Sequence, residues 1–151
     1  MITIKIQEDD FAHHHLYHQL RQAAPSAGAI VTFTGLVREF SEQGGIQHME
    51  LECYPAMAKT TLAKIAEEAV NRWSILGCTV IHRIGKLYAH EQIVFVGTAA
   101  QHRQAAFESA SYVMDYLKTE APFWKKEVHS SGAHWVAAKT SDQEARKKWL
   151  K

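Results

Sequence analysis

The chain has 151 residues, of which 46% are hydrophobic and 22% charged, and these values predict one globular domain over residues 1–151 and exclude wholesale disorder. The sequence contains 17 Lys and Arg residues and 16 Asp and Glu residues, which gives a formal net charge of +1. Because nucleic acids and anionic membranes attract a broad positive field, this balance argues against both as general partners.

The N-terminal segment predicts a strand followed by a helix. Isoleucine occupies every second position of residues 2–6, which is typical of a short strand with one buried face. Asp9 or Asp10 is expected to cap a helix that runs to about Gln22. Its apolar residues are Phe11, Leu16, Tyr17 and Leu20.

Two further strands are predicted around a polar segment. Residues 29–37 are rich in β-branched side chains and indicate a strand. Residues 39–47, with two consecutive glycines, predict a polar loop and the best candidate for a mobile segment. Apolar and polar residues alternate over 49–53, which favours another half-buried strand.

The middle of the chain predicts a long helix and two strands. Pro55 is expected to open a helix over residues 56–73. Residues 78–84 and 92–98 indicate strands separated by a turn at 85–90. The inner face of the helix is expected to contain Leu62, Ile65, Ala66, Ala69 and Val70.

The last third predicts a helix, a hairpin and a second helix. Residues 103–118 carry apolar side chains at helical spacing. Segments 123–128 and 134–138 read as a hairpin around residues 130–132, and 142–150 as a final helix. The apolar positions of the first helix are Phe107, Ala110, Val113, Met114 and Leu117.

This order of elements predicts an α+β fold, with helices packed on a mainly antiparallel sheet in a single domain. Strands and helices are mixed without the strict alternation of a doubly wound fold. The sequence lacks the glycine-rich dinucleotide and phosphate loops, the zinc-protease motif and the nucleophile elbow.

Histidine and cysteine spacing gives little support for a metal site. His13, His14 and His15 are consecutive, so on a helix they point in three directions. His129 and His134 flank a turn, where a two-ligand site is conceivable, but solvated histidines are the simpler interpretation. Cys53 and Cys78 lack metal-ligand spacing, and a disulfide between them stays open.

Two features suggest the compartment. The N-terminal residues lack the long apolar region of a signal peptide, and no segment reaches the roughly 18 apolar residues of a membrane span. We therefore expect a soluble, reduced protein in the cytoplasm.

Basic residues lie near the predicted helix and strand ends. His102 and Arg103 begin a helix, where free N–H groups and the helix dipole favour an anion. Arg38 follows a strand, and Lys118 lies in the last turn of a helix. Each alone is explained as a solvated charge or, for Lys118, as a complement to the helix C-terminus.

Lys125 and Lys126 are adjacent on a predicted strand and follow Phe123 and Trp124. Because side chains alternate along a strand, the two lysines point to opposite faces. A pocket on either face of this strand, the Phe123 face or the Trp124 face, can therefore contain at most one of the two lysines.

Five segments carry a resemblance to a known family: 31–38 (VTFTGLVR), 51–57 (LECYPAM), 80–85 (VIHRIG), 93–97 (IVFVG) and 114–127 (MDYLKTEAPFWKKE). Taken together, they resemble the large, catalytic subunit of molybdopterin synthase, the MoaE family. The similarity spans nearly the whole chain after the N-terminal helix, and its most specific segment is residues 114–127. Cys53, Ala56 and Lys139 depart from the residues expected in relatives.

The resemblance implies an α/β-hammerhead-like fold and a sulfur-transfer reaction. Its substrate would be cyclic pyranopterin monophosphate, the precursor of molybdopterin. Two sulfurs, which make the dithiolene, would arrive as thiocarboxylates on the C-terminal Gly-Gly of a small ubiquitin-like partner subunit. Because the partner brings the sulfur, we expect no catalytic cysteine, no cofactor and no metal.

The resemblance also implies the site residues. Lys118 is expected to be the central catalytic residue, aided by Lys125, and which of them moves protons stays open. Arg suits the phosphate because it binds oxyanions in a bidentate way. The substrate-binding set is Leu36, Val37, Arg38, His102, Arg103, Lys118, Lys125, Lys126 and Glu127.

The spacing of two of these residues predicts an assembly. Arg103 and Lys118 are fifteen residues apart on one predicted helix, about 22 Å at 1.5 Å per residue. A homodimer with composite pockets would bring both to one substrate, and one small partner per pocket would make a heterotetramer. A broken helix is the rival explanation, but the segment between them contains no Pro or Gly.

Three other functions compete with this prediction. A noncatalytic phosphometabolite-binding module would use the same basic pocket without turnover. A nucleic-acid binder would use the Lys125–Lys126 and Lys147–Lys148 pairs with nearby tryptophans, although the charge balance counts against it. A structural partner would carry the basic residues merely as surface charge.

Overall fold

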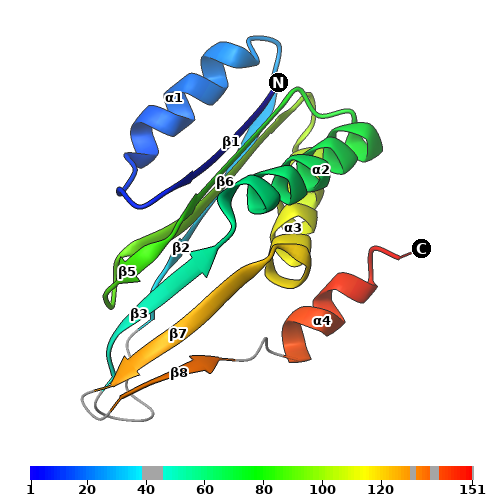
Figure 1. Ribbon diagram of the computed structural model, residues 1–151. Coiled ribbons are helices and arrows are strands. Elements are labelled where there is room, and N and C mark those ends of the chain that lie inside the picture. Colours follow the sequence, from blue (N-terminus) through cyan, green and yellow to red (C-terminus); the bar gives the residue numbers. More distant parts are fainter. Residues whose placement is uncertain (39–45, 130–131, 137–139, 151) are drawn as a thin grey trace.

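Within the residues that the structure describes, the fold contains two four-stranded sheets and four helices, and the α+β prediction is confirmed (Figure 1). The computed structural model describes residues 1–38, 46–129, 132–136 and 140–150. No helix in these ranges is long and apolar enough to cross a membrane.

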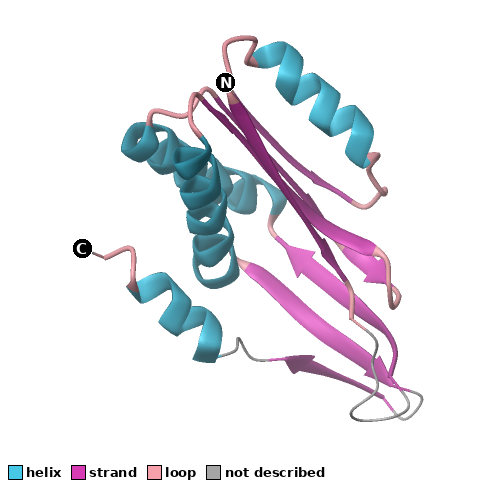
Figure 2. Cartoon of the chain, turned by 180° about the vertical axis from the view of Figure 1, so that it is seen from behind, coloured by secondary structure: helices cyan, strands magenta, loops and turns pink. Residues whose placement is uncertain are grey.

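The first sheet is built around two buried central strands. Its order is β1-β4-β6-β2, and all pairs are antiparallel except β1 with β4. All seven residues of β4 are buried because helices cover both faces of the sheet (Figure 2). The strands are β1 (Ile2–Gln7), β2 (Ala29–Leu36), β4 (Gly77–Arg83) and β6 (Gln92–Ala100).

The second sheet has the order β5-β3-β7-β8 and is antiparallel throughout. In Figure 1 it lies below the first sheet, next to the C-terminal end of α3. Its strands are β3 (Ile46–Cys53), β5 (Gly85–Leu87), β7 (Phe123–His129) and β8 (Gly132–Val136). The hairpin predicted near the C-terminus is therefore the pair β7 and β8.

The helices form separate layers on the first sheet (Figure 2). The long helices α2 (Pro55–Trp73) and α3 (Arg103–Glu120) cover one face, and α1 (His13–Ala23) covers the other. Successive side chains of β4 point to opposite faces of the sheet and so contact both helix layers. Val80 packs toward α2 and α3, whereas Ile81 packs with Phe11 and Leu16 toward α1. The sheet is thus the centre of the hydrophobic core.

The C-terminal helix α4 (Thr140–Lys147) packs against α3. Trp149, just after it, donates its indole N–H to Asp115 Oδ2 at 2.6 Å and lies edge-on to Trp73 and Tyr112. Arg72 donates to the Trp149 carbonyl at 3.0 Å. These contacts attach the end of the described chain to the two long helices.

Three predictions about local structure were wrong. Helix α1 has Ala12 as its N-cap, because Asp10 Oδ1 instead accepts the Phe11 N–H and the Gln92 amide, both at 2.8 Å. The predicted turn at 85–90 contains strand β5, whose Leu87 pairs with β3 and is fully buried. Both differences depend on partners far away in the sequence.

The third error concerns Phe107, which is 62% exposed although its spacing predicted a buried helical face. The buried face of α3 includes the predicted Ala110, Val113 and Leu117, with Ala106 rather than Phe107 as its N-terminal member. Of the predicted polar loop, residues 39–45 lie outside the described residues, and the last two belong to β3.

Candidate functional site

The junction between α3 and β7 places two of the predicted lysines in the same region of the molecule. Lys118 is exposed in the last turn of α3, which ends at Glu120. β7 begins three residues later at Phe123 and carries Lys125, which is half-buried. The connection from the C-terminal end of α3 to the start of β7 is short (Figure 1), so the two segments that carry the predicted catalytic lysines meet there.

The register of the second sheet links Lys125 to the segment around Arg38. Lys125 lies opposite Leu51 of β3, and cross-strand neighbours share a face of the sheet. Leu51 packs in a buried cluster with Val37, Met49 and Leu87. Arg38 is exposed and directly follows Val37, which packs with Leu51 on the second sheet.

Backbone hydrogen bonds fix the chain just before Arg38. The Val37 N–H donates to the Glu91 carbonyl at 2.8 Å, and the His90 N–H donates to the Val37 carbonyl at 2.7 Å. Leu36 is 56% exposed, whereas Val37 is buried. The segment thus anchors one side chain in the core and offers Leu36 and Arg38 at the surface.

The two adjacent lysines of β7 point to opposite faces, as alternation predicts. Lys126 Nζ lies 3.3 Å from Glu50 Oε2 and 5.2 Å from the Trp135 ring centroid. Hydrogen bonds from His48 and Lys126 lower the pKa of the Glu50 carboxyl. Within one chain, the structure separates Lys126 from Lys125, whereas Glu127 shares the Lys125 face.

His102 and Arg103 lie at the other end of α3. His102 is the N-cap of the helix and makes no side-chain capping bond, and both residues are exposed. They line an open depression together with Gln104, Phe107 and Glu108. The helix is unbroken from Arg103 to Glu120, so one chain does not bring this depression to Lys118.

His82 is a residue near the lysines that the sequence prediction missed. Its ring stacks on Phe123 with centroids 4.0 Å apart and planes inclined by 14°. The pKa of His82 is lowered to about 4, mainly by burial. The hydrogen bond to the Arg83 carbonyl opposes this shift, and the positive charge of Lys118 adds to it. The signal in the sequence was a histidine in the buried row of β4 after Cys78 and Val80.

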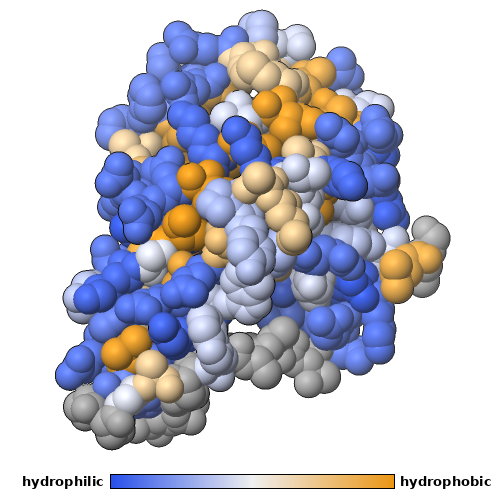
Figure 3. Space-filling model, viewed as in Figure 1, coloured by the Kyte–Doolittle hydropathy of each residue, from blue (hydrophilic) through white to orange (hydrophobic). Residues whose placement is uncertain are grey.

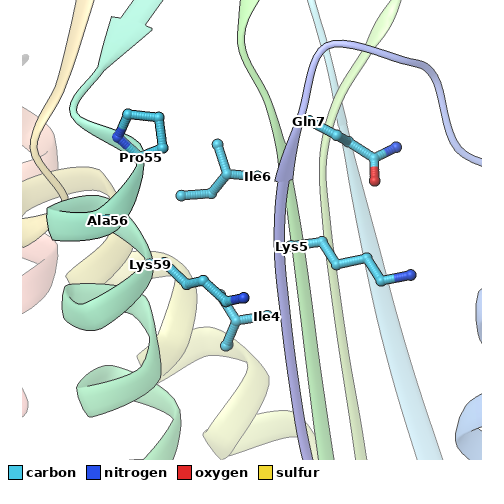
Figure 4. Close-up of a pocket in the computed structure, with 7 residues that line it drawn as sticks. All are labelled: Ile4, Lys5, Ile6, Gln7, Pro55, Ala56 and Lys59. Atoms are coloured by element: carbon cyan, nitrogen blue, oxygen red, sulfur yellow. The ribbon is translucent and has the colours of Figure 1, made fainter.

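A second depression lies between the edge strand β1 and the start of α2 (Figure 4). Ile4 and Ile6 point toward α2 there, whereas Lys5 and Gln7 point away from it. Pro55, Ala56 and Lys59 complete the described lining, which includes none of the predicted site residues. On the face in Figure 3, hydrophobic surface gathers in the upper and middle part between hydrophilic flanks.

Histidine and cysteine side chains do not assemble into a centre within the described part of the chain. No three His, Cys, Asp or Glu residues there are grouped to hold a metal ion. Cys53 and Cys78 are separate thiols, so the open question of a disulfide is answered against it. Burial raises the pKa of both thiols, that of Cys78 to about 12.

Comparison with known proteins identifies the family. The family described as MoaE protein matches residues 6–120. The molybdopterin synthase catalytic subunit of Escherichia coli strain K12 is 51% identical over 122 residues, covering 81% of each chain. That of Mesorhizobium japonicum is 49% identical over 149 residues, covering 97% of this chain and 92% of the relative.

Solved structures agree with this result. The MoaE protein of Burkholderia ambifaria has a TM-score of 0.87 and 46% identity, covering 100% of this chain and 99% of that one. Molybdopterin synthase from Staphylococcus aureus has a TM-score of 0.80 and 28% identity, covering 87% and 95%. The chain therefore belongs to the MoaE family, the family of the molybdopterin synthase catalytic subunits.

Proposed function

We propose that this chain is the catalytic subunit of a molybdopterin synthase. It transfers sulfur from the C-terminal thiocarboxylate of a small ubiquitin-like subunit to cyclic pyranopterin monophosphate, and two transfers make the dithiolene. Membership of the MoaE family supports this function. The structural observation that carries it is the placement of Lys118 and Lys125 on either side of the short connection from α3 to β7.

The charges of the reactants explain why this site is rich in cations. The substrate phosphate and the thiocarboxylate are both anions, and a guanidinium such as Arg38 binds an oxyanion in a bidentate way. Once the sulfur is bonded to the pterin, water attacks the partner's acyl carbon, and negative charge develops on the acyl oxygen as the water adds. The carbon–sulfur bond then breaks, which leaves a carboxylate on the partner and the sulfur on the pterin. A preorganised ammonium group stabilises the charge on the acyl oxygen, and we assign this role to Lys118, aided by Lys125.

The active form in this proposal is a homodimer with composite pockets. His102 and Arg103 of one copy complete the pocket that holds Arg38, Lys118 and Lys125 of the other. Two-fold symmetry generates two such pockets, and one small subunit at each makes a heterotetramer. The unbroken helix between Arg103 and Lys118 supports this arrangement.

The partner contributes a flexible Gly-Gly tail that enters the pocket. Glycine suits a narrow, extended path because it has no side chain to clash with the walls.

We place the reaction in the reducing cytoplasm, a location supported by the two separate thiols of Cys53 and Cys78.

Reconstitution tests the function directly. The protein is mixed with the thiocarboxylated small subunit and the pterin precursor, and dithiolene formation is measured. The same subunit with an ordinary C-terminal carboxylate is the control and should give no product. Binding of the pterin phosphate without turnover would identify a noncatalytic phosphometabolite-binding module instead.

A further inference from the structure

The side chain of His82 is a buried titratable group that the proposed chemistry does not use. It continues the row of Cys78 and Val80 on the face of β4 that packs toward α2 and α3. Only 6% of the residue is exposed, so an imidazole stands where the pattern of the strand calls for an apolar side chain. A buried polar group of this kind requires a partner.

Two contacts hold the imidazole in place. Its Nδ1 lies 2.8 Å from the Arg83 carbonyl oxygen, so Nδ1 carries the proton and donates it. Its ring lies parallel to Phe123, with a centroid separation of 4.0 Å. Arg83 is fixed in turn by three hydrogen bonds, two to the Glu8 carbonyl and one to the Gln92 carbonyl, and this makes the support rigid.

The same ring contacts the segment that carries one of the two lysines and lies near the other lysine. Phe123 precedes Lys125 by two residues on β7, so both side chains are on one face of that strand. The ammonium group of Lys118 is close enough to affect the titration of His82. The ring is therefore placed where the end of α3 and the start of β7 meet the first sheet.

We propose that His82 is a positioning residue for sulfur transfer: its neutral imidazole, held by the Arg83 carbonyl and stacked on Phe123, sets the spacing between Lys118 and Lys125. A neutral ring suits this position because an imidazolium would repel the ammonium group of Lys118. This inference deepens the proposed function and rests on it for its kinetic test.

The kinetic test is a double-mutant cycle between His82 and Phe123. His82→Leu should lower kcat about 10- to 100-fold, the scale of a small misplacement of catalytic groups, with KM for the pterin within threefold. Phe123→Leu should have a similar effect, and the double variant should lose little more than either single variant. Thr79→Val, on the opposite face of β4, is the control and should keep kcat within twofold.

His82→Asn provides a second variant because its amide retains a donor near the position of Nδ1. It should recover part of the lost kcat. A kcat for folded His82→Leu within twofold of the wild type would overturn the proposal, and so would independent, multiplicative losses in the cycle. A raised KM with unchanged kcat would also reject it.

An imidazole titration by NMR tests the placement without turnover, so it is informative even if the proposed activity is absent. In the wild-type protein, His82 should be neutral at pH 7 with the proton on Nδ1. Lys118→Met should raise the pKa of His82 by removing a nearby positive charge, whereas Lys59→Met should leave it unchanged. An imidazole that does not respond to the Lys118 substitution would disprove the proximity of His82 to Lys118 on which the proposal depends.

Discussion

Arg103 and Lys118 lie in the first and last turns of the same unbroken helix, α3. Fifteen residues at 1.5 Å per residue place their Cα atoms about 22 Å apart. A pterin monophosphate is too short to contact both residues of one chain. If both bind substrate, as proposed, each pocket must draw them from different copies.

Complementation tests this arrangement. Arg103→Ala and Lys118→Ala homodimers should each be nearly inactive, because every pocket lacks one residue. After dissociation and mixing, a heterodimer should hold one pocket with both residues intact and one with neither, so activity should return. Verified heterodimers that stay as inactive as their parents would show that each pocket uses both residues of one chain.

Lysines at the junction of α3 and β7 should be needed for the rate, whereas a distant surface lysine should not. Lys118→Ala should fold normally and lose about 10²–10³ in turnover, the cost of removing one preorganised charge. Lys125→Ala should also be impaired and accumulate half-sulfurated intermediate. Lys147→Ala is the control, because Lys147 lies on α4 in an exposed ion pair with Glu144, and its turnover should stay within about threefold. Near-normal product formation by folded Lys118→Ala would reject the catalytic assignment.

Removal of the partner's last two glycines should separate binding from transfer. The rest of the partner should contact a surface outside the pocket, so the truncated subunit should still associate detectably. Sulfur transfer should be abolished, because the thiocarboxylate no longer reaches Lys118. Association is measured by calorimetry and transfer by dithiolene formation. Product made with the truncated partner would contradict tail insertion.

Neither cysteine should be needed for turnover. The sulfur comes from the partner, and Cys53 and Cys78 are separate thiols whose pKa burial raises. A protein that carries Cys53→Ser and Cys78→Ala should therefore retain the wild-type kcat within about threefold once its folding is verified. A loss of more than a hundredfold in the folded variant would indicate a sulfur relay through a cysteine.

Cys78 should also make the fold sensitive to alkali. Burial raises the pKa of its thiol to about 12, whereas an unfolded thiol titrates near pH 8.5. Between these values the folded state binds more protons than the unfolded state, so stability should fall as pH rises. Urea unfolding from pH 8 to 11 should show a smaller decline in the free energy of unfolding for Cys78→Ala. Equal declines would contradict this assignment.

Local periodicity determined most of the secondary structure. The helix predicted over 56–73 is α2, and the one over 103–118 is α3, because apolar residues at helical spacing need only near neighbours. Alternation alone likewise separated Lys125 from Lys126, since side chains on a strand change face at every residue. The motif segments indicated the family for the same reason: they are contiguous in the chain.

Contacts between distant segments decided the rest. Gly85–Leu87 is a strand because it pairs with β3. Asp10 does not cap α1 because its carboxylate accepts a hydrogen bond from the Gln92 amide instead. No short window of sequence contains either pair. The position of His82 against Phe123 joins residues 41 positions apart. The sequence by itself determined which residues are available for chemistry, whereas the tertiary structure decided which of them meet, because pairing and stacking depend on segments that only folding brings together.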